Sequence, residues 1–267
     1  MSQKTGYRIR TLIVLALISM LYTVSPLLFA DKASAELTLD INHSHIKIDF
    51  LYHGSEVSVK GTADRGTDLI IKITSPNGHE SLRKKGKIAG ILWMNVGQIN
   101  FENVPGFYSI HSTKDIKKML DPAEMDKYGI GYSALEKNSE ITGISESDRK
   151  KWFAEFLKYK KGAKLYSTSV GMIEISEKEG ILSYYTKVSW PYQAKPGEYK
   201  VTVYAVKDGK VIEQSEKTVL VEQVGIVKTL ADMAKQSGAL YGIISIVIAL
   251  GAGFGVGIIF RKGGGSH

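Results

Sequence analysis

The segment that most limits how this chain can fold lies near its C-terminus. Residues 238–260, GALYGIISIVIALGAGFGVGIIF, hold no charged side chain. A helix of this length spans roughly 34 Å, which is enough to cross a hydrocarbon core of about 30 Å. Arg261 and Lys262 follow at once, and cations beside a span favour the cytoplasmic side of a membrane. We therefore expect one transmembrane helix at 238–260 and a cytoplasmic tail at 261–267.

The first 35 residues have the pattern of an export signal. A start with three cations precedes a long apolar stretch, and the small residues ASA end at Ala35, as a cleavage site requires. We expect a signal peptide at 1–35 that is removed after Ala35. The apolar stretch is long, so an uncleaved anchor is the alternative. A cleaved signal followed by the C-terminal span places residues 36 to about 237 outside the cytoplasm.

Charge and cysteine content exclude several classes of function. The whole chain carries net charge +8, and without residues 1–35 it carries +5, spread along the sequence. A nucleic-acid-binding protein would show a stronger and more clustered excess. The chain has no cysteine, so its exported part has no disulfide and must depend on a hydrophobic core. Thiolate metal sites and thiol catalysis are excluded as well.

Two regions have the period of β-strands. Apolar and polar residues alternate over much of 37–113 and again over 163–222, as half-buried strands require. Asp208-Gly209 in the second region is typical of a two-residue hairpin turn. We predict a mainly β fold, in which residues 36–222 form an immunoglobulin-like β-sandwich with a helical insertion at 114–162. Two small sandwiches joined by the helices are the alternative.

The insertion carries two helix signals. Asp121-Pro122 is an N-cap followed by proline at the first helical position. Ser145, with Asp148 three residues later, opens a second helix that closes at Gly162. Its aromatic and aliphatic side chains share one face, which we expect to pack on the sandwich rather than on a membrane surface; they are Trp152, Phe153, Phe156 and Leu157.

A further helix is expected at 223–237, continuing into the membrane span. Within the span, small residues recur four positions apart, a spacing that lets two membrane helices approach closely. Either a homodimer or a partner permease would satisfy this pattern. The glycines concerned are Gly238, Gly242, Gly251, Gly253, Gly255 and Gly257.

A cluster of cations is one candidate binding site. Arginine and lysine beside a tight turn can bind a small anion, and Arg65 could join them from a neighbouring turn. The commoner reading is a solvated basic hairpin tip, leading into a core strand whose buried face is set by Ile91 and Trp93. The tentative anion-binding residues are Arg65, Arg83, Lys84, Lys85 and Lys87.

Metal binding and catalysis have weaker signals. His43 and His45 share a strand face and are tentative metal ligands, but a site needs three or four converging ligands. The sequence has no nucleophile elbow, phosphate-binding loop or dinucleotide-binding motif. We therefore expect a protein that is not an enzyme and needs no cofactor.

Several stretches resemble one family of bacterial envelope proteins, the transmembrane family Alph_Pro_TM first described in alpha-proteobacteria. The likeness covers most of the chain after residue 36, although TSPNG stands where the family has a Gly-Pro pair. The stretches that carry it are SHIKIDFLYHGSEVSVKG, RKKGKIAGILWMN, NVPGFYSIHST, SYYTKVSWPYQAKPGEYKVTVYAVKDGKVI and LYGIISIVIALGAGFGVGIIFRK.

The resemblance implies a location and an architecture, because the family has no established activity. It implies the bacterial inner membrane, with the bulk of the chain periplasmic. Its association with sulfite-exporter-type permeases suggests an accessory role. We predict a single-pass membrane protein whose outer part is a non-enzymatic accessory or binding module for a membrane partner such as a permease. The alternative is a periplasmic protein that binds a small anion or a metal.

Overall fold

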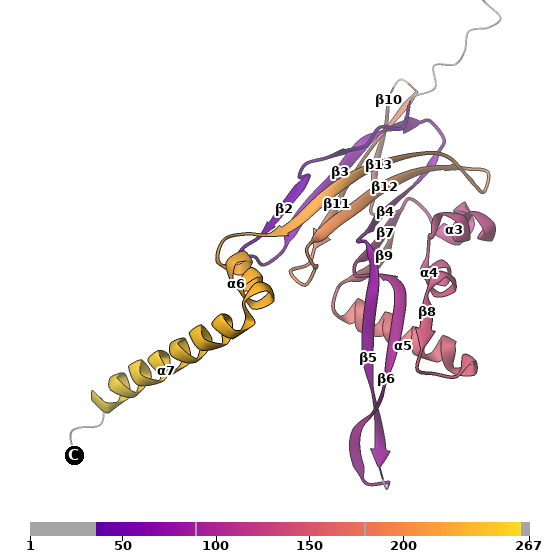
Figure 1. Cartoon of the computed structure of the whole chain (residues 1–267). Coiled ribbons are helices and arrows are strands. Elements are labelled where there is room, and N and C mark those ends of the chain that lie inside the picture. Colours follow the sequence, from indigo (N-terminus) through magenta and orange to yellow (C-terminus); the bar gives the residue numbers. More distant parts are fainter. Residues whose placement is uncertain (1–35, 89, 179, 263–267) are drawn as a thin grey trace, which may run out of the picture. The chain divides into compact units, whose positions relative to one another are not determined.

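A computed structural model describes residues 36–88, 90–178 and 180–262 (Figure 1). The predicted signal peptide and residues 263–267 of the predicted tail lie outside the described residues. The described chain is mainly β, as predicted, and adds a group of helices between two strands and two helices at its C-terminal end.

Two β-sheets contain strands from both halves of the chain. A four-stranded sheet has the order β1-β3-β11-β10, and a six-stranded sheet has the order β2-β13-β12-β4-β7-β9. Because each sheet mixes early and late strands, the two halves do not form separate sandwiches. The strands are β1 Asp40–Ile41, β2 His45–Ile48, β3 Ser55–Asp64, β4 Asp68–Thr74, β7 Tyr108–Ser112, β9 Tyr166–Val170, β10 Glu174–Lys178, β11 Ile181–Trp190, β12 Gly197–Lys207 and β13 Lys210–Gln223.

The immunoglobulin-like topology is not confirmed. The six-stranded sheet is mixed, since β13 pairs in parallel with β2 and β7 pairs in parallel with β9. The other pairs in the two sheets are antiparallel. The predicted hairpin turn between β12 and β13 is confirmed: Asp208 and Gly209 both have positive φ, 50° and 81°, the conformation that favours Asp-Gly there.

The central strands of the six-stranded sheet, β12, β4 and β7, have core on both faces. Leu69, Ile71 and Ile73 of β4 face a core shared with the four-stranded sheet, where they meet Val57 and Val188 among others. Alternate residues of the same strands face a second core on the opposite side. The second core includes Ile70, Tyr108, Ile110, Tyr166 and Tyr204 of the sheet, and it is closed by Ile99 and Phe101 of β6 and by helical side chains.

The helical insertion follows β7 and covers the second core. Its helix at Asp121-Pro122 begins as predicted. The longer helix begins at Arg149, four residues after Ser145, because a short 3-10 turn with Ser145 at its N-cap position comes first. Phe153 and Phe156 are buried in the second core. The elements are α2 Ile116–Met119, α3 Pro122–Tyr128, α4 Tyr132–Asn138, β8 Glu140–Thr142, the 3-10 helix Glu146–Asp148 and α5 Arg149–Gly162.

A long hairpin corrects one sequence expectation. β5 (Asn77–Ile88) and β6 (Leu92–Pro105) pair down to Ile88 and Leu92, so the cations lie along β5 and not at the turn. The segment after the cations is not a core strand either. Ile91 is 86% and Trp93 65% exposed, so the expectation of a buried face there is wrong. Neither alternating face of this end of the hairpin is buried among the described residues.

Two helices end the described chain. α6 (Gly225–Gln236) and α7 (Gly238–Lys262) are separated at Ser237, whose φ of −141° and ψ of 58° are not helical. The expected continuous helix is therefore interrupted at that residue. Gly238–Ile258 of α7 is long and apolar enough to cross a membrane, and none of its window is buried against the protein.

A buried ion pair ties the base of the hairpin to the rest of the fold. Lys160 of α5 is 1% exposed, and its Nζ lies 3.0 Å from Oε1 of Glu80 on β5. The same carboxylate accepts from the exposed Lys195, also at 3.0 Å. Burial would raise the pKa of Glu80, but the hydrogen bonds and charges of Lys160 and Lys195 outweigh it and lower that pKa.

We predict that Glu80→Gln lowers the free energy of unfolding by about 3 kcal/mol, because it leaves the buried Lys160 ammonium without a counter-charge. Lys195→Met removes the exposed partner of the same carboxylate and should cost less than about 1 kcal/mol. In the wild type the contribution of Glu80 is present at neutral pH and is lost as pH falls below 4.5, its ordinary pKa, towards the lowered value. Denaturant unfolding of the three proteins in detergent checks this; equal losses for both variants would contradict it.

Candidate functional site

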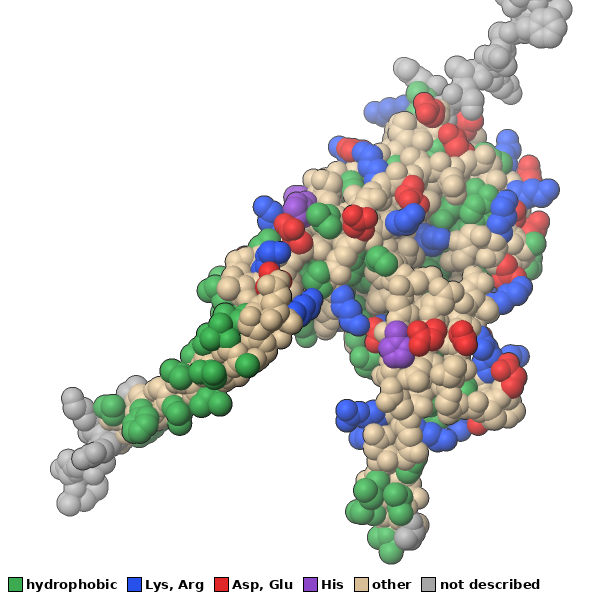
Figure 2. Space-filling model, viewed as in Figure 1, with side chains coloured by type: hydrophobic (Ala, Val, Ile, Leu, Met, Phe, Trp, Pro, Cys, Tyr) green, Lys and Arg blue, Asp and Glu red, His purple; other side chains and the backbone are tan. Residues whose placement is uncertain are grey.

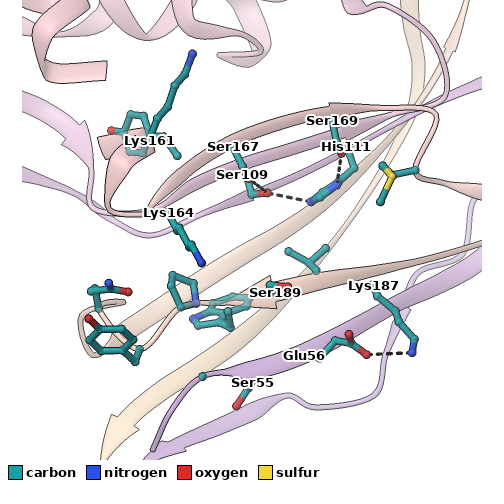
Figure 3. A pocket seen from close by; sticks show the side chains of 18 of the residues that line it. Ser55, Glu56, Ser109, His111, Lys161, Lys164, Ser167, Ser169, Lys187 and Ser189 are labelled. Atoms are coloured by element: carbon teal, nitrogen blue, oxygen red, sulfur yellow. Dashed lines mark hydrogen bonds and ion pairs between the residues drawn. The ribbon is translucent and has the colours of Figure 1, made fainter. Parts of the chain in front are cut away.

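An open cavity of about 980 Å³ lies between the two sheets, at the edge of the six-stranded sheet formed by β7 and β9 (Figure 3). One wall carries residues of β7 and β9, and the other carries the start of β3 and the end of β11. The α5–β9 connection and the loop after β11 complete the rim. The strand pair β7–β9 therefore positions one polar wall of the cavity.

A chain of hydrogen bonds follows the β7–β9 wall. Ser109 and His111 of β7 stand opposite Ser167 and Ser169 of β9 in the parallel register. Since side chains two apart share a strand face, all four point to the cavity side. The Oγ atoms of Ser167 and Ser109 are 2.7 Å apart, Ser109 Oγ is 2.9 Å from His111 Nε2, and His111 Nδ1 is 2.6 Å from Ser169 Oγ.

Burial sets the charge state of His111, the histidine in this chain of hydrogen bonds. His111 is 9% exposed, and desolvation lowers its pKa below the ordinary 6.5. At neutral pH the imidazole is therefore neutral, with one ring nitrogen donating to a serine hydroxyl and the other accepting. One end of this chain of hydrogen bonds is Ser167, which is exposed and can offer its hydroxyl to a ligand.

Three lysines line the cavity, and they differ in what they face. Lys187 pairs with Glu56 at 3.1 Å. Lys161 points away from the cavity in Figure 3, and its Nζ lies 4.3 Å from the centre of the Tyr132 ring. Lys164 points into the space between the serine chain and Ser189 of the opposite wall (Figure 3), and no ion pair of Lys164 is recorded within the described part of the chain.

The arrangement can bind a small oxyanion. Serine hydroxyls supply hydrogen-bond donors, and one inward ammonium supplies the opposite charge, which together match the needs of a sulfate-like or carboxylate group. Sequence reasoning missed this site. The usable signal was the alternation SIHS at 109–112 and STS at 167–169, but only the strand pairing shows that the two segments meet.

The five cations predicted as an anion site do not form one group. Arg65 lies in the turn between β3 and β4, with its Nε 3.4 Å from Glu177 of β10. The other four lie on β5, in a separate three-stranded sheet with β6 and β8. On that strand Lys84 turns towards Trp152 and Lys87 towards Trp93, at 5.7 Å and 5.4 Å from the ring centres. Arg83 and Lys85 are exposed.

The two predicted metal ligands are not joined by further ligands. His43 is exposed in the link between β1 and β2, and His45 at the start of β2 places its Nε2 2.9 Å from Glu222. Across residues 36–88, 90–178 and 180–262, no group of three or more His, Cys, Asp or Glu side chains is placed to hold a metal ion.

The glycines predicted to pack against another helix all lie on α7. Two of them, Gly253 and Gly257, line an open groove of about 410 Å³ together with Ala249 and neighbouring apolar side chains. The groove exists because these positions lack bulk, so a second helix could approach the backbone there. Of the other four, Gly238, Gly251 and Gly255 are exposed along the same helix and Gly242 is partly buried.

The molecule is thus a mainly β protein that carries, within its described residues, a helix able to cross a membrane. A comparison with family models agrees with this class: residues 36–262 match the family described as "Putative transmembrane protein (Alph_Pro_TM)". The chain belongs to that family, as its motifs predicted. A search of curated proteins gave no match.

We predict that His111 makes stability depend on pH in a way that His111→Gln does not. Because the folded-state pKa is lowered, the unfolded chain takes up the proton first, and the wild type loses stability as pH falls from about 6.5. The loss is at most about 1.4 kcal/mol per pH unit. Glutamine keeps a donor and an acceptor but does not titrate. Unfolding at about pH 7.5 and about pH 5.5 should show a larger loss for the wild type, and equal losses would contradict a buried neutral His111.

Proposed function

We propose that this family member is a single-pass, membrane-anchored protein whose outer part is a non-enzymatic binding module. Residues 36–222 face the periplasm, α7 crosses the inner membrane, the C-terminus is cytoplasmic and residues 1–35 are the export signal. The pattern of the first 35 residues supports export. The uncharged length of α7 and the cations at 261–262 support this orientation.

The ligand that the cavity between β7, β9 and β11 fits is a small oxyanion. The observation that carries this proposal is that Lys164 and the exposed end of the serine chain line the same cavity. A charge-assisted hydrogen bond from an ammonium is stronger than one between neutral groups. The neutral state of His111 leaves Lys164 as the cation that selects for negative charge at this wall.

The serine–histidine contact supports binding rather than acyl transfer. Ser109, whose Oγ faces His111 Nε2, is 1% exposed, so a substrate cannot reach it without rearrangement of the wall. The other ring nitrogen faces the hydroxyl of Ser169. A hydroxyl stabilises an imidazolium far less than the carboxylate found at that place in serine hydrolases. The chain of hydroxyls acts as a fixed polar wall.

We predict that the full chain in detergent binds sulfite, sulfate or phosphate with measurable heat in titration calorimetry. Lys164→Gln should weaken that binding by about tenfold or more, since it removes a charge-assisted contact. Lys161→Gln is the matched control: it removes a cation three residues away that faces Tyr132, and binding should change by less than about twofold. Absence of heat with all three anions, or equal effects of the two substitutions, would contradict the site.

A second role, as the accessory subunit of a membrane partner, is supported by α7. The groove at Gly253 and Gly257 is open along the span, and a lipid-facing helix gains packing when a partner helix fills such a groove. A permease of the sulfite-exporter type would join this role to oxyanion binding, because the outer module would hold the substrate that the partner moves. A homodimer would use the same groove.

We predict that Gly253→Ile reduces co-purification of a membrane partner, or of a second tagged copy, by at least about fivefold. Gly251→Ile adds the same side chain on the opposite side of the helix, about 200° away, and should leave association unchanged. Pull-down from detergent-solubilised native membranes measures both. If neither substitution changes the recovered proteins, or no partner and no second copy is recovered, the accessory role by way of this groove is wrong.

A further inference from the structure

The free end of the β5–β6 hairpin is unusually apolar for a surface loop. Figure 2 shows hydrophobic side chains gathered at that end, with lysine and arginine side chains further along the hairpin. We call this end the apolar tip. Each of its large side chains is at least 45% exposed, and a solvated turn would instead carry polar residues. The apolar tip consists of Ile88, Ile91, Leu92, Trp93, Met94 and Val96.

The two faces of the tip differ in a way that suits a membrane interface. Ile88 pairs with Leu92 and Gly86 with Met94, so these residues share one face. Val96 fills the place where a side chain of Gly86 would stand, which completes an aliphatic face. The opposite face pairs Lys87 with Trp93, and tryptophan with lysine is the combination enriched where hydrocarbon meets headgroups.

The charges beside the apolar tip indicate whether a lipid surface or a protein contacts it. The sequence from Ser81 to Phe101 contains four cations and no acidic residue. No ion pair of these cations is recorded within the described residues, and only Lys84 turns back towards α5, over Trp152. Arg83, Lys85 and Lys87 are exposed and remain for an anionic partner. A run of cations without acids beside an apolar end matches anionic phospholipid.

We propose that the apolar tip inserts into the headgroup–acyl boundary of an anionic phospholipid leaflet, with Lys85 and Lys87 on the phosphates. The insertion is shallow, because the outer backbone edges of an isolated hairpin are unpaired and cannot enter the hydrocarbon core. Interfacial amphipathic helices lie about 5–10 Å deep, and the apolar tip reaches a comparable depth in this proposal. A membrane anchor in the same chain raises the effective concentration of lipid around the tip.

The absence of cysteine makes the test direct, because one introduced cysteine is the only labelling site. Leu92→Cys places an environment-sensitive fluorophore at the apolar tip, on a side chain that is 60% exposed. Lys178→Cys is the matched control at the end of the β10–β11 hairpin, which is also exposed but polar. Both full-length proteins are placed in vesicles of phosphatidylethanolamine and phosphatidylglycerol that contain a nitroxide near the start of the acyl chain. Flotation first shows that both variants are incorporated.

The proposal predicts that the nitroxide quenches the label at residue 92 at least about threefold more than the label at 178. Lys85→Glu with Lys87→Glu, in the Leu92→Cys background, should reduce that quenching at low salt. Equal quenching at 92 and 178 overturns the proposal. It is also overturned if residue 92 is shielded only in native membranes and not in pure lipid, since the occupant would then be a protein. Failure of flotation would count against the membrane anchor, whereas floated protein with an unquenched tip counts against the insertion alone.

Discussion

Burial of both faces of the central strands of the six-stranded sheet is the constraint on which the rest of the structure depends. No residue of β4 or β7 is exposed, and Val201 to Val206 of β12 are all buried, because one face packs on the four-stranded sheet and the other on helices and on β6. A chain without cysteine has only such packing to hold it. The helical insertion and the base of the hairpin are therefore parts of the core rather than additions to a finished sandwich.

The same constraint places the candidate site. The insertion leaves the sheet after β7 and returns as β9, and the return strand pairs in parallel with the strand that the chain left. Tyr108, Ile110 and Tyr166 face the helices, so the alternate residues Ser109, His111 and Ser167 face the other way. At this edge of the sheet they meet a cavity instead of a core. Because the helices cover one face of β7 and β9, strand alternation turns the polar residues of the opposite face towards the cavity.

Much of the fold could be predicted from local pattern, and the candidate site could not. Alternation located most strands, Asp208-Gly209 located a hairpin, and Pro122 located the start of a helix, because each depends on residues close in sequence. The β7–β9 pairing joins residues 58 apart, and nothing local encodes it. The prediction that the cations of β5 form the hairpin tip failed for a related reason. Periodicity shows which residues alternate, but it does not show where the hairpin turns or what covers it.

The most direct test of the doubly buried sheet is amide hydrogen exchange of the full chain, followed residue by residue. Central strands that are covered on both faces should exchange only through global unfolding, so amides of β4, β7 and β12 should be the slowest and share one free energy of opening. The edge strand β10 and the free end of the β5–β6 hairpin should exchange faster through local opening. If amides of β12 exchange as fast as those of β10, the central strands are not buried on both faces, and this account of the fold is wrong.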